Sequence, residues 1–151
     1  MIYLGADHAG FELKEEIKKF LLNLGLDVED KGAMALDLND DYPDFVAPVA
    51  KAVALRQAHG EHNAVGIVLG GSGQGEAIVA NKIKGIRSAV YYGGNLDIVK
   101  LSRQHNDANV LSLGARFLTK EQALEAVKLW LATPFEGGRH ARRVQKIDST
   151  P

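Results

Sequence analysis

A glycine-rich loop that carries one glutamate is the stretch of this sequence best suited to chemistry. The apolar run Val65–Leu69 has the pattern of a buried strand, and the spacing from Ala77 onward indicates a helix. Between them stand closely spaced glycines: Gly70, Gly71, Gly73 and Gly75. Glycine lets the backbone turn tightly and lets N–H groups approach a ligand without a Cβ in the way. The loop therefore predicts a cradle for an anion or an oxyanion, with Glu76 where the helix begins.

Two standard phosphate-binding motifs fail at this glutamate. The P-loop pattern requires a lysine where Glu76 stands, and the dinucleotide fingerprint requires a glycine there. The end of the next predicted strand offers Tyr91 and Tyr92 instead of an acid for a ribose hydroxyl. A phosphate about 4 Å from the carboxylate would also meet a repulsion on the order of 4 kcal/mol at an effective dielectric of about 20.

We therefore interpret the loop as a group of N–H donors that face a carbonyl oxygen becoming an oxyanion. The donors would be the backbone amides of Gly71, Ser72, Gly73, Gln74 and Gly75, and Glu76 would be the adjacent base. The alternative is a glutamate that only complements the positive end of the helix, an effect worth about 0.3–1 kcal/mol.

Length and composition limit the possible functions. A chain of 151 residues fits one domain that buries roughly two thirds of the surface exposed by its unfolded form. The net charge of −1 gives no indication of nucleic acid, and no apolar run is long enough for a membrane span. The absence of cysteine excludes disulfides and thiolate sites and is compatible with a reducing compartment, so we expect a cytoplasmic protein without a membrane or nucleic-acid partner.

Strand and helix patterns alternate along the chain. They predict a three-layer α/β/α Rossmann-like domain with a five-stranded parallel sheet. The expected strands are Ile2–Ala6, Leu26–Lys31, Val65–Leu69, Ile86–Tyr91 and Val110–Leu113. The expected helices are Phe11–Leu24, Phe45–Leu55, a helix from about Ala77, Leu96–Arg103 and Lys120–Leu131.

Three further candidates fall near the carboxyl ends of these strands, the edge at which open α/β sheets bind ligands. Asp7 and His8 follow the first strand, and Arg116 follows the fifth. Asp7 as a helix cap and His8 as a loop side chain are the alternatives. Tyr42 lies in a polar loop and could wall off a small polar substrate.

Two other polar stretches are assigned no chemistry. The acids Asp37, Asp40 and Asp41 lack the spacing of a calcium loop, and we expect a solvated loop that caps the next helix. His59 and His62 lie in a polar connector without further ligands nearby, which favours an exposed loop over a metal site.

The last candidates come late in the chain. His105 closes a helix, where it could interact with the dipole as a C-cap or move protons for a substrate. Arg139 and Arg143 are four residues apart, so a helix would present both guanidinium groups to one phosphate. A solvated basic tail is the alternative, and the segment from about residue 135 could also reach another subunit.

Together these residues resemble the type-B ribose-5-phosphate isomerase family, which includes galactose- and allose-6-phosphate isomerases. The resemblance runs from Gly5-Ala6-Asp7-His8-Ala9-Gly10 through the loop Gly71–Glu76, Ala80-Asn81-Lys82, His105-Asn106 and Gly114-x-Arg116 to Arg139-His140. It implies aldose–ketose isomerisation of a sugar 5-phosphate through a cis-enediolate, without a metal or other cofactor. One branch of the family uses a cysteine base at the position of Gly70, and the other a glutamate at the position of Glu76.

The resemblance also implies a role for each candidate. Glu76 would move the proton between C1 and C2, Ser72 would assist transfer between O1 and O2, and Asp7 and His105 would help to open the ring. The phosphate would be bound by His8, Arg116, Arg139 and Arg143, and the sugar by Tyr42 and Asn106. Family members are dimers or dimers of dimers with sites at the interface, so His105, Asn106 or the arginines could serve a neighbour's site.

The sequence thus predicts an enzyme that interconverts ribose 5-phosphate and ribulose 5-phosphate. Two alternatives stay open: an isomerase that prefers a six-carbon aldose 6-phosphate, and a sugar-phosphate binding protein without activity.

Overall fold

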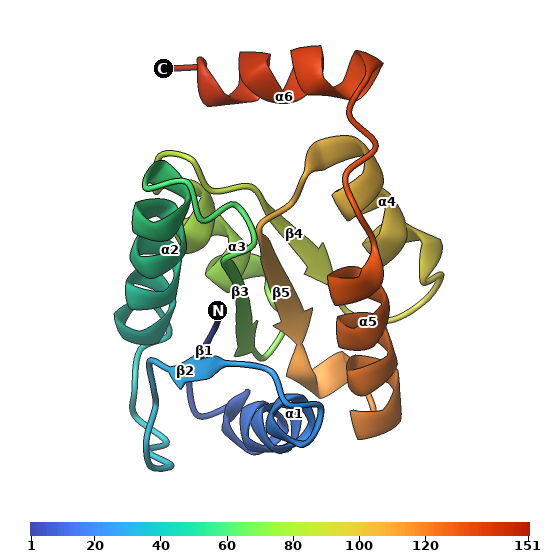
Figure 1. Ribbon diagram of the computed structural model, residues 1–151. Helices are drawn as coiled ribbons and strands as arrows, with labels where there is room; N and C mark the ends of the chain where they lie inside the picture. Colours follow the sequence, from blue (N-terminus) through green and yellow to red (C-terminus); the bar gives the residue numbers. More distant parts are fainter.

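The computed structural model describes residues 1–151 and contains one parallel sheet between two layers of helices (Figure 1). The strand order is β2-β1-β3-β5-β4, and every neighbouring pair is parallel. The strands are β1 (Ile2–Ala6), β2 (Val28–Asp30), β3 (Val65–Gly70), β4 (Ser88–Tyr91) and β5 (Val110–Gly114). The predicted three-layer fold with a five-stranded parallel sheet is confirmed.

Helices connect the strands and cover both faces of the sheet. They are α1 (Phe11–Asn23), α2 (Pro43–Ala58), α3 (Gln74–Asn81), α4 (Asp97–Asn106), α5 (Lys120–Ala132) and α6 (Arg139–Asp148), with a short 3₁₀ turn, η1 (Ala115–Phe117). In Figure 1, α2 and α3 lie on one side of the sheet and α1, α4 and α5 on the other. No helix combines the length and apolar character needed to span a lipid bilayer.

Alternating side chains of the strands form two separate cores. On β1, Ile2 and Leu4 face the core shared with α1 and α5, whereas Tyr3 faces the core formed with α2 and α3. The larger core includes Trp130, and the smaller one is rich in valines of α2. Because β1, β3 and β5 are buried on both faces, they read as continuous apolar runs, and this is why the sequence predicts these three strands well.

Several boundaries differ from the predictions. Helix α2 begins at Pro43 instead of Phe45, because proline fits the first turn of a helix, and it runs to Ala58. Helix α4 continues past Arg103 to Asn106 and ends at Asp107, which has φ 46°. Leu24, expected on the apolar face of α1, is 54% exposed because it caps the end of that helix.

A buried lysine takes a place in α1 that the apolar pattern does not predict. Lys14 is fully buried, and its Nζ donates to Asp30 Oδ2 at 2.5 Å and to Glu15 Oε1 at 2.7 Å. Burial alone would raise the pKa of Asp30, but the hydrogen bonds from Lys14 and Lys18 outweigh it and hold that pKa below its ordinary value. The pair therefore fixes α1 against the end of β2.

We expect Asp30→Asn to lower the free energy of unfolding by about 3–5 kcal/mol, because it leaves the buried ammonium of Lys14 with only the half-exposed Glu15 as a charge partner. Urea titration at neutral pH measures the change. Lys18→Ala is the matched control, since that ammonium is 33% exposed and its removal should have a much smaller effect. In the wild type, the depressed pKa of Asp30 means that its contribution is present at neutral pH and is lost as the pH falls through that pKa. A small effect of Asp30→Asn would show that Lys14 does not depend on this carboxylate.

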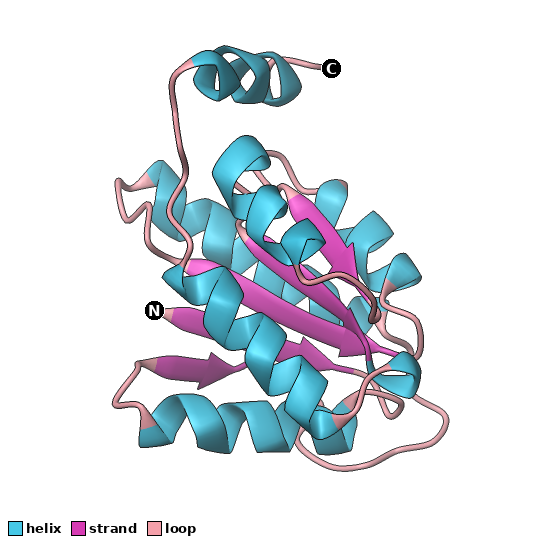
Figure 2. Ribbon diagram, turned by 90° about the vertical axis from the view of Figure 1, so that its right-hand side faces the viewer, coloured by secondary structure: helices cyan, strands magenta, loops and turns pink.

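The two edges of the sheet have different surroundings. At the carboxyl ends, β1 and β3 lie side by side while their following helices cover opposite faces, which creates the crevice typical of ligand sites in open α/β sheets. At the opposite edge, α6 lies beyond the amino ends of the strands, joined to α5 by an extended connector (Figures 1 and 2).

Candidate active site

An open cavity of about 530 Å³ lies at the carboxyl ends of β1 and β3. It is lined by Asp7, His8, Ala9, Tyr42, Gly71, Ser72, Gly75, Glu76, Arg116 and Phe117. Eight of the predicted site residues, from four segments of the chain, line this one cavity: Asp7, His8, Tyr42, Gly71, Ser72, Gly75, Glu76 and Arg116. Gly73 and Gln74 of the predicted oxyanion loop do not line it. Phe117 is an additional wall that the sequence did not indicate.

Glu76 is a buried carboxylate in the first turn of α3. Glu76 is only 3% exposed to solvent, although it lines the cavity. Burial raises its pKa above the ordinary glutamate value, and the nearby charge of Asp7 raises it further, while the N–H groups of Glu76 and Gly73 oppose the shift. A carboxyl with a raised pKa beside a cavity is suited to accept and return a proton near neutral pH.

Gly70, the last residue of β3, makes room for this carboxylate. A Cβ built on Gly70 would lie 1.7 Å from Glu76 Oε1 and 2.2 Å from its Cδ, well inside atomic contact. The side-chain volume of position 70 is therefore filled by the end of Glu76. A side chain at position 70 and the carboxylate in its present place exclude each other.

The glycine loop leads into the start of α3, where backbone N–H groups lie outside the helical hydrogen bonds. The first hydrogen bond within α3 runs from Ala77 N to Gly73 O at 3.1 Å, so the amides of Gln74, Gly75 and Glu76 precede the helical ladder. Gly73 has φ 77°, the left-handed conformation that glycine favours, and its carbonyl accepts from Ser112 Oγ at 2.6 Å. Gln74 N donates to Ser72 Oγ at 3.3 Å, and the helix dipole favours negative charge at this point.

Two further glycines allow large side chains to approach the loop closely. The guanidinium of Arg116 lies over Gly71, where a Cβ would be 3.2 Å from Nη1, and Arg116 N donates to Gly71 O at 3.1 Å. The ring of Tyr42 lies against Gly75, where a Cβ would be 2.6 Å from the ring. Arg116 and Tyr42 thus form walls of the cavity on either side of the loop.

Asp7 closes the turn before α1 and lines the cavity, but it is not the helix cap considered for it, because the N-cap of α1 is Gly10, which provides no side-chain cap. Its Oδ1 accepts from Ala9 N at 3.0 Å and from Gly10 N at 3.2 Å, which stabilises the turn before α1. Asp7 is 6% exposed and lies near enough to Glu76 to influence its pKa. The structural role therefore does not exclude a chemical one.

Asp40 is a site residue that the sequence did not reveal. Asp40 Oδ1 accepts from the backbone N of His8 at 3.0 Å and lies 2.7 Å from His8 Nδ1, while Oδ2 is buried without a hydrogen-bond partner. The expectation of a solvated loop was wrong for this acid, because its side chain is 7% exposed. A carboxylate at Nδ1 favours the tautomer that carries a proton there, so Nε2 of His8 is left to contact a ligand.

The remaining predicted residues lie near the amino ends of the strands, opposite the cavity. His105 and Asn106 end α4 just before β5 begins, and Arg139 and Arg143 lie on α6. None of the four lines the cavity, and both arginines are exposed. Arg139 and Arg143 are helical, as the four-residue spacing requires, but within one chain they do not meet Arg116.

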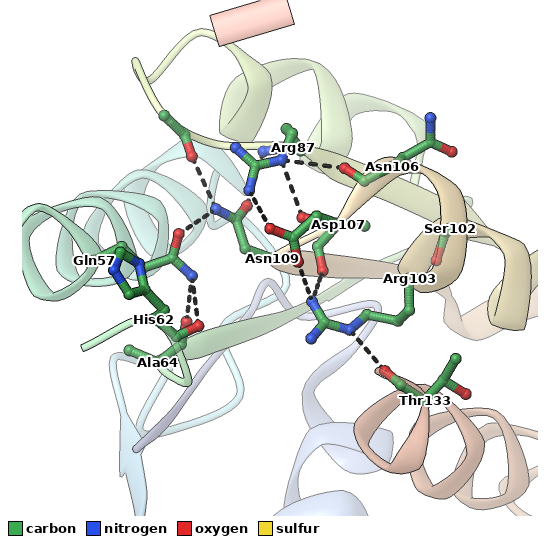
Figure 3. A network of polar contacts seen from close by, with 12 residues as sticks. Gln57, His62, Ala64, Arg87, Ser102, Arg103, Asn106, Asp107, Asn109 and Thr133 are labelled. Carbon is green, nitrogen blue, oxygen red and sulfur yellow. Dashed lines mark hydrogen bonds and ion pairs between the residues drawn. The ribbon is translucent and has the colours of Figure 1, made fainter. Parts of the chain in front are cut away.

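A polar network fixes the end of α4 on which His105 and Asn106 stand. Arg87 donates to the carbonyl of Asn106 at 3.2 Å and to Asp107 Oδ2 at 3.1 Å, and Arg103 Nη1 lies 3.4 Å from Asp107 Oδ1 (Figure 3). Arg87 also contacts Asp148 of α6 at 3.0 Å. In Figure 3 the side chain of Asn106 points away from this network, so it is available for another contact.

Comparison with known proteins gives consistent matches over nearly the whole chain. Residues 2–147 match the family described as Ribose/Galactose Isomerase. The chain is 43% identical to ribose-5-phosphate isomerase B of Escherichia coli over 97% of this chain and 93% of that protein. It is 41% identical to the protein of the same name from Mycobacterium tuberculosis, over 95% of this chain and 85% of the relative.

Solved structures agree with these matches. Ribose-5-phosphate isomerase B of Clostridium thermocellum superposes with a TM-score of 0.88 at 45% identity, covering 97% of this chain and 94% of the other. The enzyme of that name from Mycoplasma genitalium, solved with bound ribulose-5-phosphate, has a TM-score of 0.89 at 39% identity, with 97% and 93% covered.

Proposed function

The chain belongs to the Ribose/Galactose Isomerase family, and we infer that it is an aldose–ketose isomerase that interconverts ribose 5-phosphate and ribulose 5-phosphate. The observation that carries this inference is the buried carboxylate of Glu76, whose pKa is raised, beside the amides at the start of α3. Relatives with this name and a relative with bound ribulose-5-phosphate support the five-carbon pair over a six-carbon substrate.

In the proposed reaction, Glu76 removes the proton on C2 of the open-chain aldose. The electron pair moves toward the carbonyl, and O1 becomes an oxyanion of a cis-enediolate. The amides of the Gly71–Gly75 loop stabilise this charge, and removal of one such donor typically costs about 2.7–4 kcal/mol. The hydroxyl of Ser72 assists transfer of the O2 proton to O1, and Glu76 returns its proton to C1. Because a carboxylate and amides perform each step, the proposed reaction requires no metal.

We assign the phosphate and the ring-opening step to the other walls of the cavity. The guanidinium of Arg116 donates to the phosphate, away from the carboxylate of Glu76, and His8 donates to it from Nε2–H as an imidazolium whose Nδ1–H is held by Asp40. Tyr42 covers the sugar from the side of Gly75. Asp7 lies within the cavity and takes part in opening the furanose ring.

We expect Asp40→Asn to raise KM for ribose 5-phosphate by roughly 10–100-fold with little change in kcat, because a charge-assisted hydrogen bond worth about 1.5–3 kcal/mol no longer orients His8. Initial rates over a range of substrate concentrations measure both constants. Asp37→Asn is the matched control, since Asp37 is exposed and accepts only from Asn39 N nearby. A fall in kcat with an unchanged KM would mean that Asp40 acts on the chemical step.

A second copy of the chain completes the proposed site. His105, Asn106, Arg139 and Arg143 lie at the edge opposite their own cavity, on the end of α4 and on the projecting α6 (Figure 2). In a two-fold dimer, the same residues of each chain can serve the cavity of the other. His105 then assists ring opening, Asn106 binds sugar hydroxyls, and the two arginines add charge for the phosphate.

Mixing two inactive variants tests this arrangement. Chains with Glu76→Gln and chains with His105→Asn, unfolded and refolded together in equal amounts, should recover about one quarter of the wild-type activity, because half of the dimers are mixed and each mixed dimer has one intact site. Glu76→Gln mixed with Ser72→Ala is the control, since both changes lie in the same cavity and no intact site can form. No recovery in the first mixture, with subunit exchange verified by mass, would place His105 in its own chain's site or outside any site.

The function itself is tested by turnover and by isotope exchange. We expect ribulose 5-phosphate to form from ribose 5-phosphate with chelator present, and solvent deuterium to enter C2 of the recovered aldose. Allose 6-phosphate assayed in parallel should react more slowly. Faster turnover of allose 6-phosphate would change the substrate, and ligand-induced stabilisation without deuterium exchange would indicate a binding protein.

A further inference from the structure

A cluster of two histidines and one glutamate lies where α6 meets α4. His105 belongs to α4, His140 to the first turn of α6, and Glu136 to the connector before α6. Glu136 Oε2 lies 4.0 Å from Nε2 of His105 and 3.7 Å from Nε2 of His140. One ligand atom from each of the three residues lies within 4.8 Å of the other two.

The backbone and the packing hold these three side chains together. Glu136 N donates to the carbonyl of Gln104 at 3.1 Å, which fixes the connector next to His105. The imidazole rings of His105 and His140 are stacked, with centroids 4.1 Å apart and planes 10° apart. His140 is 5% exposed, and the contact between Arg87 and Asp148 fixes the far end of α6.

The chemistry of the cluster suits a divalent transition metal. Two imidazole nitrogens and one carboxylate form the ligand set of open zinc sites, which leave the fourth position to water. Burial lowers the pKa of His140, and the charges of His105, Arg139 and Arg143 lower it further, while Glu136 opposes the shift. Arg139 and Arg143 also repel a cation, whereas Glu136 attracts one, and this balance favours moderate affinity.

A small movement would bring the ligands to coordination distance. Ligands about 2.0–2.1 Å from a tetrahedral ion are roughly 3.3 Å apart, somewhat closer than the present separations. The side chains of His105 and Glu136 are 37% and 49% exposed and can turn toward an ion, while the more buried His140 is the fixed member.

We propose that His105, Glu136 and His140 bind one Zn²⁺ per chain and that this ion inhibits the enzyme. The inhibitory part rests on the proposed function, in which His105 serves the neighbouring cavity. An imidazole nitrogen that coordinates zinc cannot exchange protons with a sugar, and the bound ion holds the ring against α6. Zinc is thus a reversible inhibitor and not a cofactor of the reaction.

Binding is tested first, without substrate. Metal-stripped protein is titrated with Zn²⁺ against a chromogenic chelator, and we expect one ion per chain. Glu136→Gln and His140→Gln should each weaken binding by tenfold or more, since even outer-shell changes typically weaken metal sites by about 10–100-fold. His62→Ala in the exposed connector is the control and should leave binding unchanged. Mg²⁺ should not compete, because it prefers oxygen ligands.

Two outcomes of the titration would overturn the site: undiminished zinc binding in Glu136→Gln, or loss of binding in His62→Ala. Circular dichroism melting shows whether His140→Gln is folded, and the exposed Glu136 provides a second variant if it is not.

Inhibition is then measured in the isomerase assay. Zn²⁺ should inhibit the wild type at concentrations that fill the site, should inhibit Glu136→Gln only at tenfold or higher concentrations, and should be fully reversed by excess chelator. Zinc binding without inhibition would overturn the inhibitory part and would count against a role of His105 in catalysis. A protein without any isomerase activity would contradict the proposed function, while the titration would still decide the zinc site.

Discussion

Glu76→Gln is expected to lower kcat for ribose 5-phosphate by about 10⁴-fold, the upper end of the usual contribution of a general base. The amide keeps the size of the carboxyl group but cannot accept the proton of C2. KM should change little, because the variant leaves Arg116 and His8, the proposed phosphate ligands, in place. Coupled detection of ribulose 5-phosphate measures both constants, and a variant with nearly normal kcat would exclude Glu76 as the base.

The same variant should fold at least as well as the wild type. Burial raises the pKa of Glu76 in the folded protein, so the folded state binds the proton more tightly than the unfolded state. The contribution of this group to stability is therefore present in acid and is lost as the pH rises through the raised pKa. Glutamine removes the charge, so the melting temperature at pH 7 should be equal or higher, which separates lost chemistry from lost folding. In the wild type, kcat/KM should fall as the pH drops through the same pKa.

The sequence predicts which residues lie together at the carboxyl ends of the strands, because the order and direction of the strands determine their positions. Once β1, β3 and β5 are parallel neighbours, the residues that follow them must meet at one edge. Asp7, Glu76 and Arg116 come together for this reason, without any knowledge of side-chain contacts. The continuous apolar runs of these strands allow the strands, and from them the sheet topology, to be predicted from the sequence.

Contacts between segments that are far apart in the sequence leave no comparable pattern in it. Asp40 reaches His8 across 32 residues, and the pattern of its segment resembles that of the neighbouring exposed acids. Lys14 is buried in α1 because Asp30 of the next strand neutralises it, and an amphipathic pattern alone would place a lysine outside. In both cases a single charged partner overrides the local preference.

The position of α6 is the other feature that the sequence left open. The basic spacing of Arg139 and Arg143 predicts a shared helix face, and both lie on α6. Pattern alone does not show that α6 lies beyond the amino ends of the strands, far from the cavity of its own chain (Figure 1). The connector before α6 and its contact with α4 through His105 and His140 set that position.

Gly70→Ala should lower kcat by at least about 10²-fold while the fold is retained, because misplacing a catalytic group by about 1 Å has an effect of that size. The new Cβ would lie 1.7 Å from Oε1 and 2.9 Å from Oε2 of Glu76, so the carboxylate must leave its present position. Gly70 has no positive φ, so alanine causes no backbone strain there. Steady-state kinetics and a melting curve measure the two effects separately.

A double variant shows whether the effect of Gly70→Ala acts through Glu76. If it does, Gly70→Ala combined with Glu76→Gln should be no slower than Glu76→Gln alone, since residues that act as one unit are strongly non-additive. Gly71→Ala is the matched control: its Cβ would meet the flexible Arg116 side chain at 3.2 Å, so it should raise KM more than it lowers kcat. The same overlap would account for the two branches that the family resemblance implies, because a cysteine side chain at position 70 and a carboxylate from position 76 would occupy one volume. Full activity of Gly70→Ala would mean that the proton is removed from somewhere other than this volume.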